Sequence, residues 1–541
     1  MPSGRTGRRE PAAETYDETT DVLVVGGGYA GLAAALFLAH QGVATVLVDR
    51  HPGSSVQGRA RGINQRTMEL YRPLGIAESI RRAGRPFDDE AGVVRCEALS
   101  AEWTWLLADD TRKPLPELTP AEFVMADQRS VEPILVDSAR ARGADVRFGT
   151  RCVSTRPDDD GVTTVVEDAA GGARRVVRSR FLVAADGFRG RIRETVGIDR
   201  AGPGVTQHWV TFLVRADLAG IVRQRAMFWI VVNDELGLAS FLTTSVPDEW
   251  AMSVSFDPAR TPTSSYTAER CRELARSFLG VDRPVEVLDV AAWEEAVGVA
   301  DRFRAGRVFL VGDTAHVWPP AGAMGANAAV QDAHNLAWKL AGVLGGWAGE
   351  GLLDAYEAER RPAALALADI TVARQRARFG EEPATEDVDD VLCTLGQRYR
   401  STATVGATHD TVYGRQLPRR AMPGLRAPHL WLDRGGRRIS VHDLCHDAFV
   451  LLTGSAAVRW DGVGSLVARE LSVPLRAYRI GSAAAGADLV DVERVFAARY
   501  GAAGATLLRP DGYVAWCSPD AVVDPAAALR EALRTVLGRA D

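Results

Sequence analysis

The sequence predicts an α/β protein made of two or three compact units. Three observations favour this fold class. Buried apolar strands alternate with helices near the N-terminus, strands of alternating polarity follow between residues 208 and 256, and a second α/β pattern begins beyond residue 428. The length of 541 residues is too great for one ordinary domain, and the apolar fraction of 46% and the charged fraction of 25% are those of globular proteins.

The first unit opens with a βαβ pattern of the Rossmann type. Asp21–Val25 is a short apolar run suited to a strand buried on both faces of a parallel sheet, Leu32–His40 is an Ala/Leu-rich helix, and Ala44–Asp49 is the next buried strand. Further strands are expected at 145–148, 162–167, 175–184, 308–311, 449–452, 475–480 and 506–508, and helices at 131–142, 328–344 and 352–379.

A glycine motif stands between that first strand and the helix. Gly26, Gly28 and Gly31 form GxGxxG, in which the first glycine allows a tight turn, the second leaves room for a pyrophosphate, and the third lets the helix pack close to the strand. The helix N-terminus then presents its amides and the positive end of its dipole to the phosphates. Asp49, at the end of the next strand, would accept hydrogen bonds from an adenosine ribose and repel a 2′-phosphate. The motif therefore predicts a dinucleotide site for NAD or FAD.

A second strand, Val308–Val311, also runs into a loop suited to a ligand. Asp313 follows it and can reach the hydroxyls of a polyol chain, and the loop contains Pro319, Pro320 and Gly322 before the next helix begins. That helix N-terminus would suit a flat, electron-accepting ring whose reduced form is anionic.

Composition and charge exclude several classes of function. The net charge is −6 and no basic block stands out, so no nucleic-acid partner is expected. The six cysteines are scattered without a CxxC pair or metal-ligand spacing, which predicts no metal site and no disulfide framework. The first twenty residues lack the apolar segment of a signal peptide, and no apolar window is long enough to span a bilayer, so we expect a cytoplasmic protein without a membrane partner.

Three motifs in the same order carry a family resemblance. The turn at 26–31, the Asp-Gly segment at 184–193 and the loop at 312–327 resemble the FAD motifs of the single-component (class A) FAD-dependent aromatic hydroxylases, the p-hydroxybenzoate hydroxylase superfamily. The whole layout is most similar to the bacterial aromatic polyketide hydroxylases of anthracycline and angucycline type, which carry an additional thioredoxin-like domain. Segments 423–429 and 508–516 resemble the opening and closing segments of that domain.

This resemblance implies a domain plan. It predicts a Rossmann-like FAD-binding domain of the glutathione-reductase type, an antiparallel-sheet substrate domain and a C-terminal thioredoxin-like domain, which lacks CxxC and is not expected to perform redox chemistry. The expected boundaries are a disordered tail at 1–20, the FAD-binding domain at 21–90, 123–200 and 291–400, the substrate-binding domain at 91–122 and 201–290, and the thioredoxin-like domain at 415–541.

The resemblance also implies the cofactor-binding residues. They are Gly26, Gly28, Gly31, Asp49, Arg50, Arg59, Gln128, Asp186, Asp313, Pro320, Gly322, Met324, Gly325 and Asn327. Arg59, in a loop that runs to Asn64, is also the catalytic candidate. Three positions depart from the family pattern: Gln65 where Pro is common, Gly190 where Ser is usual, and Ala323 where Gly is usual.

The implied activity is a monooxygenase that uses FAD, O₂ and NAD(P)H, with NADPH favoured, to hydroxylate an aromatic polyketide or another phenol through a flavin C4a-hydroperoxide. The protein must exclude water from that chemistry and favour the phenolate. His316 matches a structural residue of the family, so positive potential from nearby arginines is the alternative to a base. The arginine candidates are Arg59, Arg61, Arg374, Arg376 and Arg378.

Apolar residues of the alternating segment and of the excursion before it are candidates for the substrate pocket, although each also suits a core. These are Trp103, Trp105, Trp209, Phe212, Phe228, Trp229, Phe241 and Met252. Other outcomes remain open at this point: Baeyer–Villiger insertion, epoxidation or oxidative ring rearrangement by the same flavin chemistry, and a non-catalytic flavin- or ligand-binding protein. A flavin halogenase is disfavoured because Trp103-Thr104-Trp105 is not followed by Ile-Pro. The sequence leaves a monomer and a dimer equally open.

Overall fold

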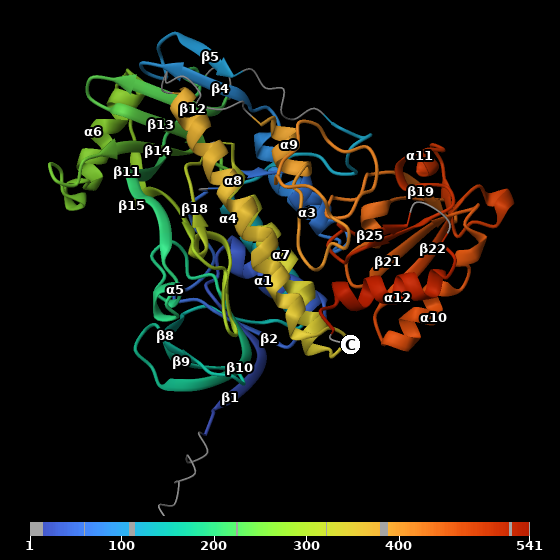
Figure 1. Ribbon diagram of the computed structural model, residues 1–541. Helices are drawn as coiled ribbons and strands as arrows, with labels where there is room; N and C mark the ends of the chain where they lie inside the picture. The colour runs from blue at the N-terminus through green and yellow to red at the C-terminus, as the bar shows by residue number, and fades with distance from the viewer. Residues whose placement is uncertain are drawn as a thin grey trace, which may run out of the picture.

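The computed structural model describes residues 15–58, 60–107, 114–222, 226–320, 322–378, 388–518 and 522–539. Most of the predicted tail (residues 1–14) and the candidate Arg59 lie outside the described residues. Figure 1 shows three bodies, with the long helices α7 and α8 running between the N-terminal and C-terminal parts. None of the described helices is both long enough and apolar enough to cross a lipid bilayer.

The first sheet has the strand order β16-β17-β10-β1-β2-β7, with β8 and β9 attached beyond β10. Its strands are β1 (Glu18–Val25), β2 (Thr45–Val48), β7 (Asp145–Arg147), β8 (Thr150–Pro157), β9 (Val162–Asp168), β10 (Arg174–Ala184), β16 (Arg304–Ala305) and β17 (Val308–Leu310). Strands β17, β10, β1, β2 and β7 are parallel neighbours, so their carboxyl ends lie along one edge. Strand β1 begins within the predicted tail because Glu18 and Thr19 already pair with β10.

Helices cover this sheet and continue from it. They are α1 (Tyr29–His40), α2 (Gln65–Tyr71), α3 (Ala77–Gly84), α4 (Gln128–Ala141), α5 (Ile192–Thr195), α7 (Met324–Leu344), α8 (Asp354–Arg378) and α9 (Asp390–Leu395), with a small ribbon formed by β3 (Gly62–Ile63) and β6 (Val124–Met125). Helix α1 is apolar around nearly its whole circumference because the sheet, α4 and α7 all pack against it.

The second sheet has the order β18-β15-β11-β14-β13-β12-β4-β5 and is antiparallel except between β4 and β12. Its strands are β4 (Ala91–Cys96), β5 (Trp103–Leu107), β11 (Arg200–Arg215), β12 (Ala226–Asn233), β13 (Gly237–Thr243), β14 (Glu249–Phe256), β15 (Glu286–Ala300) and β18 (His316–Val317), and α6 (Ala268–Leu279) covers one face. The sheet reaches Ala300, past the predicted boundary at 290, because β15 pairs with β11 along its length.

The C-terminal sheet has the order β20-β19-β23-β22-β21-β24-β25. Its elements are β19 (Trp431–Arg434), β20 (Arg437–Ser440), β21 (Phe449–Gly454), α10 (Val463–Leu471), β22 (Leu475–Gly481), β23 (Leu489–Asp491), α11 (Phe496–Tyr500), β24 (Ala505–Leu508), β25 (Val514–Ser518) and α12 (Pro525–Val536). Strands β21 and β22 are parallel, β24 pairs antiparallel with β21, and β25 pairs antiparallel with β24, which is the predicted thioredoxin-like order. Burial raises the pKa of Cys445 and that of Cys517, the latter to about 11, so both thiols stay protonated and unreactive.

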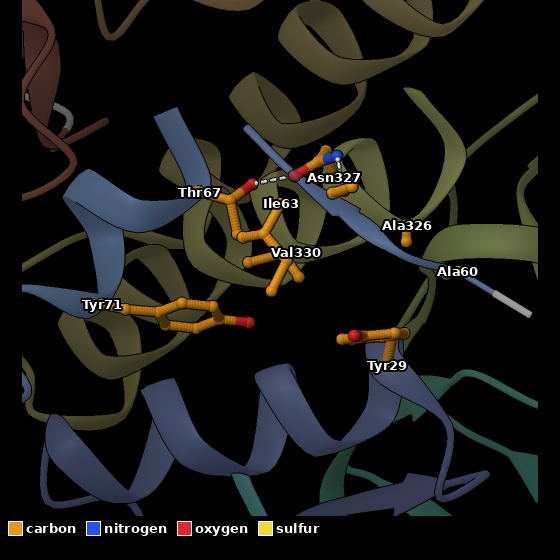
Figure 2. A pocket seen from close by; sticks show the side chains of 9 residues that line it. Tyr29, Ala60, Ile63, Thr67, Tyr71, Ala326, Asn327 and Val330 are labelled. Carbon is orange, nitrogen blue, oxygen red and sulfur yellow. Dashed lines mark hydrogen bonds between the residues drawn. The ribbon is translucent and has the colours of Figure 1, made fainter. Parts of the chain in front are cut away.

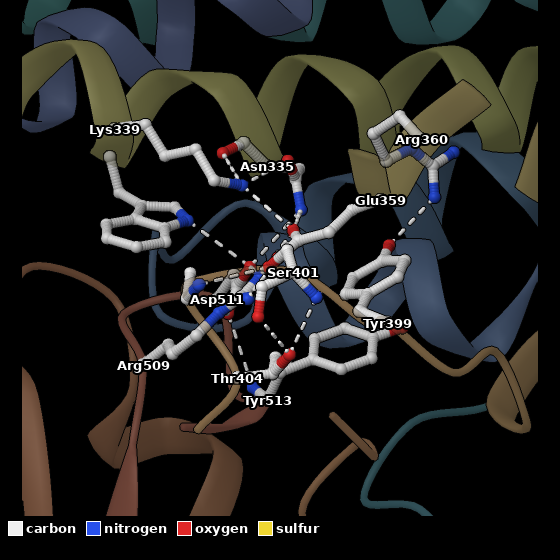
Figure 3. Close-up of polar contacts among 12 residues, drawn as sticks. Asn335, Lys339, Glu359, Arg360, Tyr399, Ser401, Thr404, Arg509, Asp511 and Tyr513 are labelled. Atoms are coloured by element: carbon white, nitrogen blue, oxygen red, sulfur yellow. Dashed lines mark hydrogen bonds and ion pairs between the residues drawn. The ribbon is translucent and has the colours of Figure 1, made fainter. Parts of the chain in front are cut away.

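A buried ion cluster joins this domain to α7 and α8 (Figure 3). Arg509 donates to Glu359 through two nitrogens at 2.5 and 2.9 Å and to Asp511 Oδ1 at 3.0 Å. Lys339 Nζ lies 2.9 Å from Glu359 Oε2, and all four side chains are at most 2% exposed. Because two cations face two anions, the cluster is neutral, and loss of one member would leave a buried uncompensated charge.

A second cluster of buried charged residues contacts the same turn of the C-terminal domain. Glu69 of α2 accepts from Arg66 Nη1 at 3.0 Å and from Arg426 Nε at 3.0 Å. Arg66 Nη2 also donates to the carbonyl oxygen of Asp511 at 2.5 Å. The turn from Arg509 to Gly512 is therefore held by α2 on one side and by α7 and α8 on the other.

We expect the stability of the protein to fall as the pH drops below about 4.5. Burial opposes ionisation of Glu359, but Arg509 and Lys339 lower its pKa from 4.5 to about 2. A carboxyl whose pKa is lower in the folded chain stabilises the fold above the unfolded-chain value, and that contribution is lost as the pH falls towards the folded value. Urea unfolding at pH 7, 4.5 and 3 should show this loss.

The matched variant is Glu359→Gln. It should be less stable than the parent at pH 7 because Lys339 and Arg509 lose the negative charge of Glu359. The difference in the free energy of unfolding between the parent and the variant should become smaller between pH 4.5 and pH 2.5. Parallel stability curves for the parent and the variant across that range would rule out Glu359 as a source of the acid sensitivity.

Candidate functional site

The carboxyl ends of the parallel strands bring the three predicted motifs together. The backbones of these segments lie so close to one another that two positions have room only for glycine. A Cβ added to Gly26 would lie 2.0 Å from the carbonyl oxygen of Ala185, and one added to Gly312 would lie 2.7 Å from the Cβ of Ala30. The glycine turn, the Asp-Gly segment and the loop after β17 therefore lie side by side.

The glycine turn leaves one open position. A Cβ on Gly28 would meet no atom within 4 Å, whereas a Cβ on Gly31 would lie 1.8 Å from the carbonyl oxygen of Gly26. Gly28 is the N-cap of α1, and no side chain caps that helix. Asp49 accepts from the Gly27 amide at 2.6 Å, which holds its carboxylate beside the turn. Open space next to uncapped helix amides fits the pyrophosphate of a dinucleotide.

Beyond Asp49, the adenosine end of the predicted site contains a buried carboxyl that sequence reasoning missed. Glu132 of α4 accepts from Gln128 Nε2 and from the Ser55 amide, both at 2.6 Å. It is 1% exposed, and burial raises its pKa. Arg50 is exposed just after β2. No local signal marks Glu132, because a glutamate within a helix normally indicates a solvated face.

Two predicted aspartates follow neighbouring strands. Asp186 accepts from Thr314 Oγ1 and from the Ile192 amide, both at 3.1 Å, and burial raises its pKa. Asp313 is exposed on the adjacent strand end. A Cβ on Gly190 would lie 2.1 Å from the Asp186 Cγ, so the glycine at this departure from the family pattern lets the carboxylate fold against the turn.

Asn327 forms hydrogen bonds with two loops. We call them the arginine loop (residues 60–64) and the proline loop (residues 312–320 and 322–323). The Oδ1 of Asn327 accepts from Thr67 Oγ1 at 2.7 Å (Figure 2) and from the Asn64 amide at 3.0 Å, and its Nδ2 donates to the carbonyl oxygens of Gly62 and Ala323 at 2.8 Å. Ala323 has a left-handed backbone with φ of 53°, which costs an L-residue about 1 kcal/mol. The backbone thus explains why glycine is usual there.

A small cavity of about 10 Å³ lies between these loops and α1. Its lining residues are Tyr29, Ala60, Gly62, Ile63, Thr67, Tyr71, Ala326, Asn327 and Val330. The Tyr71 hydroxyl points into it, as Figure 2 shows, and has no hydrogen-bond partner within the described part of the chain. Such a space holds about one water molecule.

His316 lies in the proline loop and is held as a structural residue. It is 1% exposed, its Nε2 lies 2.6 Å from Asp332 Oδ2, and its ring stacks on Trp318 at 4.5 Å. Asp332 also accepts from the Gly312 amide at 3.1 Å and from Arg360 Nε at 2.7 Å. The carboxylate therefore fixes the start of the loop, and His316 has no access to a substrate.

Two of the candidate arginines differ in what they contact. Arg61 is buried and donates to Thr243 Oγ1 at 2.9 Å, and it lies 3.3 Å from Glu90 Oε2, so its charge is balanced. Arg374 reaches the proline loop, with its Nη1 3.0 Å from the position of a Cβ on Gly322, and the same nitrogen lies 2.6 Å from Asp390 Oδ1, so its charge is balanced as well. Arg59 and the side chain of Arg378 lie outside the described residues.

One face of the antiparallel sheet is turned towards the first domain. On β15, Asp289 accepts from Gln57 Nε2, and Glu295 accepts from Gln375 Nε2 of α8 at 2.8 Å. Alternate residues share a face of a strand. Trp293 therefore lies on this face, and Trp209 stacks on it at 5.7 Å.

The opposite face packs against α6. Phe212 meets Phe278 of that helix at 6.0 Å between ring centroids, and Trp229 stacks on Trp103 at 4.6 Å. Six of the eight pocket candidates belong to this far side: Trp103, Trp105, Phe212, Trp229, Phe241 and Met252. Phe228, next to Trp229 on β12, points the other way. A role in the substrate pocket therefore stays a prediction for Trp209 and Phe228 alone among the eight candidates. The sequence pattern shows which residues share a face of the sheet, but it does not show which of the two faces is turned towards the site.

Comparisons with known proteins agree with this geometry. A family model described as an FAD binding domain matches residues 19–371, and one described as the C-terminal domain of aromatic-ring hydroxylases matches residues 420–540. A putative polyketide hydroxylase of Streptomyces halstedii is 41% identical over 98% of both chains, and a 4-methyl-5-nitrocatechol 5-monooxygenase of a Burkholderia species is 40% identical over 98% of this chain and 100% of its own. The crystal structure of an aklavinone-11 hydroxylase with FAD and aklavinone superposes with a TM-score of 0.88, at 38% identity, over 97% of this chain and 100% of its own.

The two glycines of the turn should respond differently to the same substitution. Gly28→Ala adds a methyl group to open space, so we expect the apoprotein to keep its stability while FAD binds at least about tenfold more weakly. Gly31→Ala forces the helix away from the strand and should destabilise the apoprotein itself. Thermal unfolding without FAD and a fluorescence titration with FAD measure the two effects. Unchanged FAD affinity in Gly28→Ala would show that the pyrophosphate lies elsewhere.

Proposed function

The chain belongs to the FAD-dependent aromatic-ring hydroxylases, and from that premise we propose that it hydroxylates an aromatic polyketide or a related phenol with electrons from NADPH. The observation that carries the proposal is the convergence of the open glycine turn, the Asp-Gly segment and the proline loop at one sheet edge, opposite an aromatic sheet face. Bound FAD would take a hydride from the nicotinamide and activate O₂ for transfer to the ring.

The residues at the sheet edge would hold this cofactor along its length. Gly28 and the N-terminus of α1 are placed to receive the pyrophosphate, and Asp49 the adenosine ribose. Asp313 would bind the ribityl chain. The N-terminus of α7, which begins at Met324 without a side-chain cap, would favour negative charge on the reduced ring through its dipole.

The sheet face turned towards the first domain would receive the substrate. Trp209 and Phe228 offer flat apolar surface for a fused ring system. On the same face a polar chain crosses β15, β11 and β14, in which Trp293 Nε1 donates to Thr211 Oγ1 at 2.9 Å, and Thr211 Oγ1 lies 2.7 Å from Ser253 Oγ. The phenolate is the form of a phenol most reactive towards an electrophilic oxygen, and Arg374 would favour it only weakly, because its charge is paired with Asp390.

Aerobic turnover tests the reaction directly. We expect NADPH oxidation to accelerate in the presence of an aromatic polyketide or a nitrocatechol, and the product to gain one oxygen atom by mass. NADH run in parallel decides the nicotinamide, and NMR of the product separates a new phenol from a lactone or an epoxide. Release of hydrogen peroxide alone with every ligand of the panel would refute hydroxylation, and ligand binding without any stimulated NADPH oxidation would indicate a non-catalytic binder.

A pair of phenylalanine substitutions tests which sheet face meets the substrate. Phe228→Ala should raise KM for the aromatic substrate with a small loss of stability, because this residue is half-buried on the face turned towards the first domain. Phe241→Ala, on the α6 side and fully buried, should cost about 3–5 kcal/mol of stability and leave KM nearly unchanged. The reverse pattern in KM would place the substrate on the α6 side.

The cytoplasmic location and the oligomeric state stay predictions from the sequence.

A further inference from the structure

We propose that the turn from Arg509 to Gly512 of the C-terminal domain is a positioning element for the flavin, acting on the two loops that hold the cofactor through the buried ion clusters. The inference rests on the FAD site of the proposed function and assigns to the third domain a role that requires no thiol chemistry. Its basis is a set of direct contacts that run from this turn to the proline loop and to the helix that follows the arginine loop.

The first route reaches the proline loop through α8. Arg509 holds Glu359, and the next residue of that helix, Arg360, donates to Asp332 Oδ1 at 2.7 Å. The other oxygen of Asp332 accepts from the amide of Gly312, where the proline loop begins. The path from the C-terminal domain to the loop therefore consists of two ion pairs, joined by the peptide bond between Glu359 and Arg360, and one hydrogen bond from a backbone amide.

The same turn reaches Arg360 by an aromatic path. Tyr513, just after the turn, stacks on Tyr399 at 4.1 Å, and the Tyr399 hydroxyl accepts from Arg360 Nη1 at 2.8 Å. The guanidinium of Arg509 lies 5.6 Å from the centroids of both tyrosine rings and 5.3 Å from that of Trp338. Arg360 is thus linked to the C-terminal turn by two paths, one through its neighbour Glu359 in α8 and one through the stacked rings of Tyr399 and Tyr513.

The second route reaches the arginine loop through α2. The Asp511 carbonyl accepts from Arg66, which lies two residues after Asn64 in the chain. Asn64 caps α2 by accepting from the Thr67 amide at 2.9 Å, and its own amide donates to Asn327 at the start of α7. A displacement of the turn would therefore move α2 and the proline loop together.

Burial makes this arrangement stiff. The side chains of Arg509, Glu359 and Arg360 are 0% exposed. Charges at such depth are tolerated only in their paired geometry, because water cannot compensate a broken pair. The two loops are consequently held at one separation, which is the property that a site for a rigid flavin ring requires.

Asp511→Asn in the full-length protein tests the proposal, because it removes one charge and keeps the shape of the side chain. We expect the dissociation constant for FAD to rise about 3- to 30-fold, the increase in Tm on adding FAD to shrink, and the visible absorption band of bound FAD to shift. Asp461→Asn is the matched control: Asp461 pairs with Arg479 on the surface of the same domain and touches neither cluster. It should leave all three quantities unchanged.

A milder variant covers the case in which Asp511→Asn does not fold. Tyr399→Phe removes one of the two oxygens that accept from Arg360 Nη1, leaves Gln397 as the other, and keeps the ring that stacks on Tyr513, so it should weaken FAD binding in the same direction by a smaller factor.

The outcomes are distinguishable. Equal losses of Tm with and without FAD, together with parent values for the FAD dissociation constant and spectrum, would show that the clusters only dock the domain and would overturn the inference. Failure of the parent protein itself to bind FAD would instead count against the proposed function.

Discussion

The site depends on one constraint, the close approach of three backbone segments at the carboxyl edge of a parallel sheet. Gly26 faces the carbonyl of Ala185 and Gly312 faces Ala30 at separations that leave no room for a β-carbon. Parallel strands place their carboxyl ends in register, so residues nearly 300 positions apart become neighbours without any direct pairing between their loops. Everything that would touch a dinucleotide is arranged around this edge.

Around that edge, side chains divide into those that hold the loops and those that remain available to ligands. The side chains of Asn327 and Asp332 form hydrogen bonds with backbone groups and neighbouring side chains of the loops, and His316 is hydrogen-bonded to Asp332. The open positions are Gly28 and the uncapped N-termini of α1 and α7. A large electron-carrying cofactor at this edge would find backbone amides whose position is fixed and whose charge does not change with pH.

The C-terminal domain shows a different use of buried charge. Its sheet has a thioredoxin-like order, yet its two thiols are shielded and protonated, and it contacts the neighbouring domain through three buried charged residues, Arg426, Arg509 and Asp511. Two cations, Arg509 and Lys339, and two anions, Glu359 and Asp511, form a neutral cluster in which each member depends on the others. Such a cluster gives little net stability over an apolar contact, but a shift of the domain that separated its members would leave buried charges unpaired.

The sequence by itself determined the features whose signals are local. The GxGxxG turn, the apolar strands and the motif order were readable because glycine requirements and side-chain periodicity act within a few residues, and they led to the correct fold class, family and cofactor. Tertiary structure alone decided that Phe212 and Trp229 face α6, that Glu132 is buried, and that Arg61 is neutralised by Glu90. Alternation along a strand tells which residues share a face, whereas what covers that face depends on segments far away in the chain.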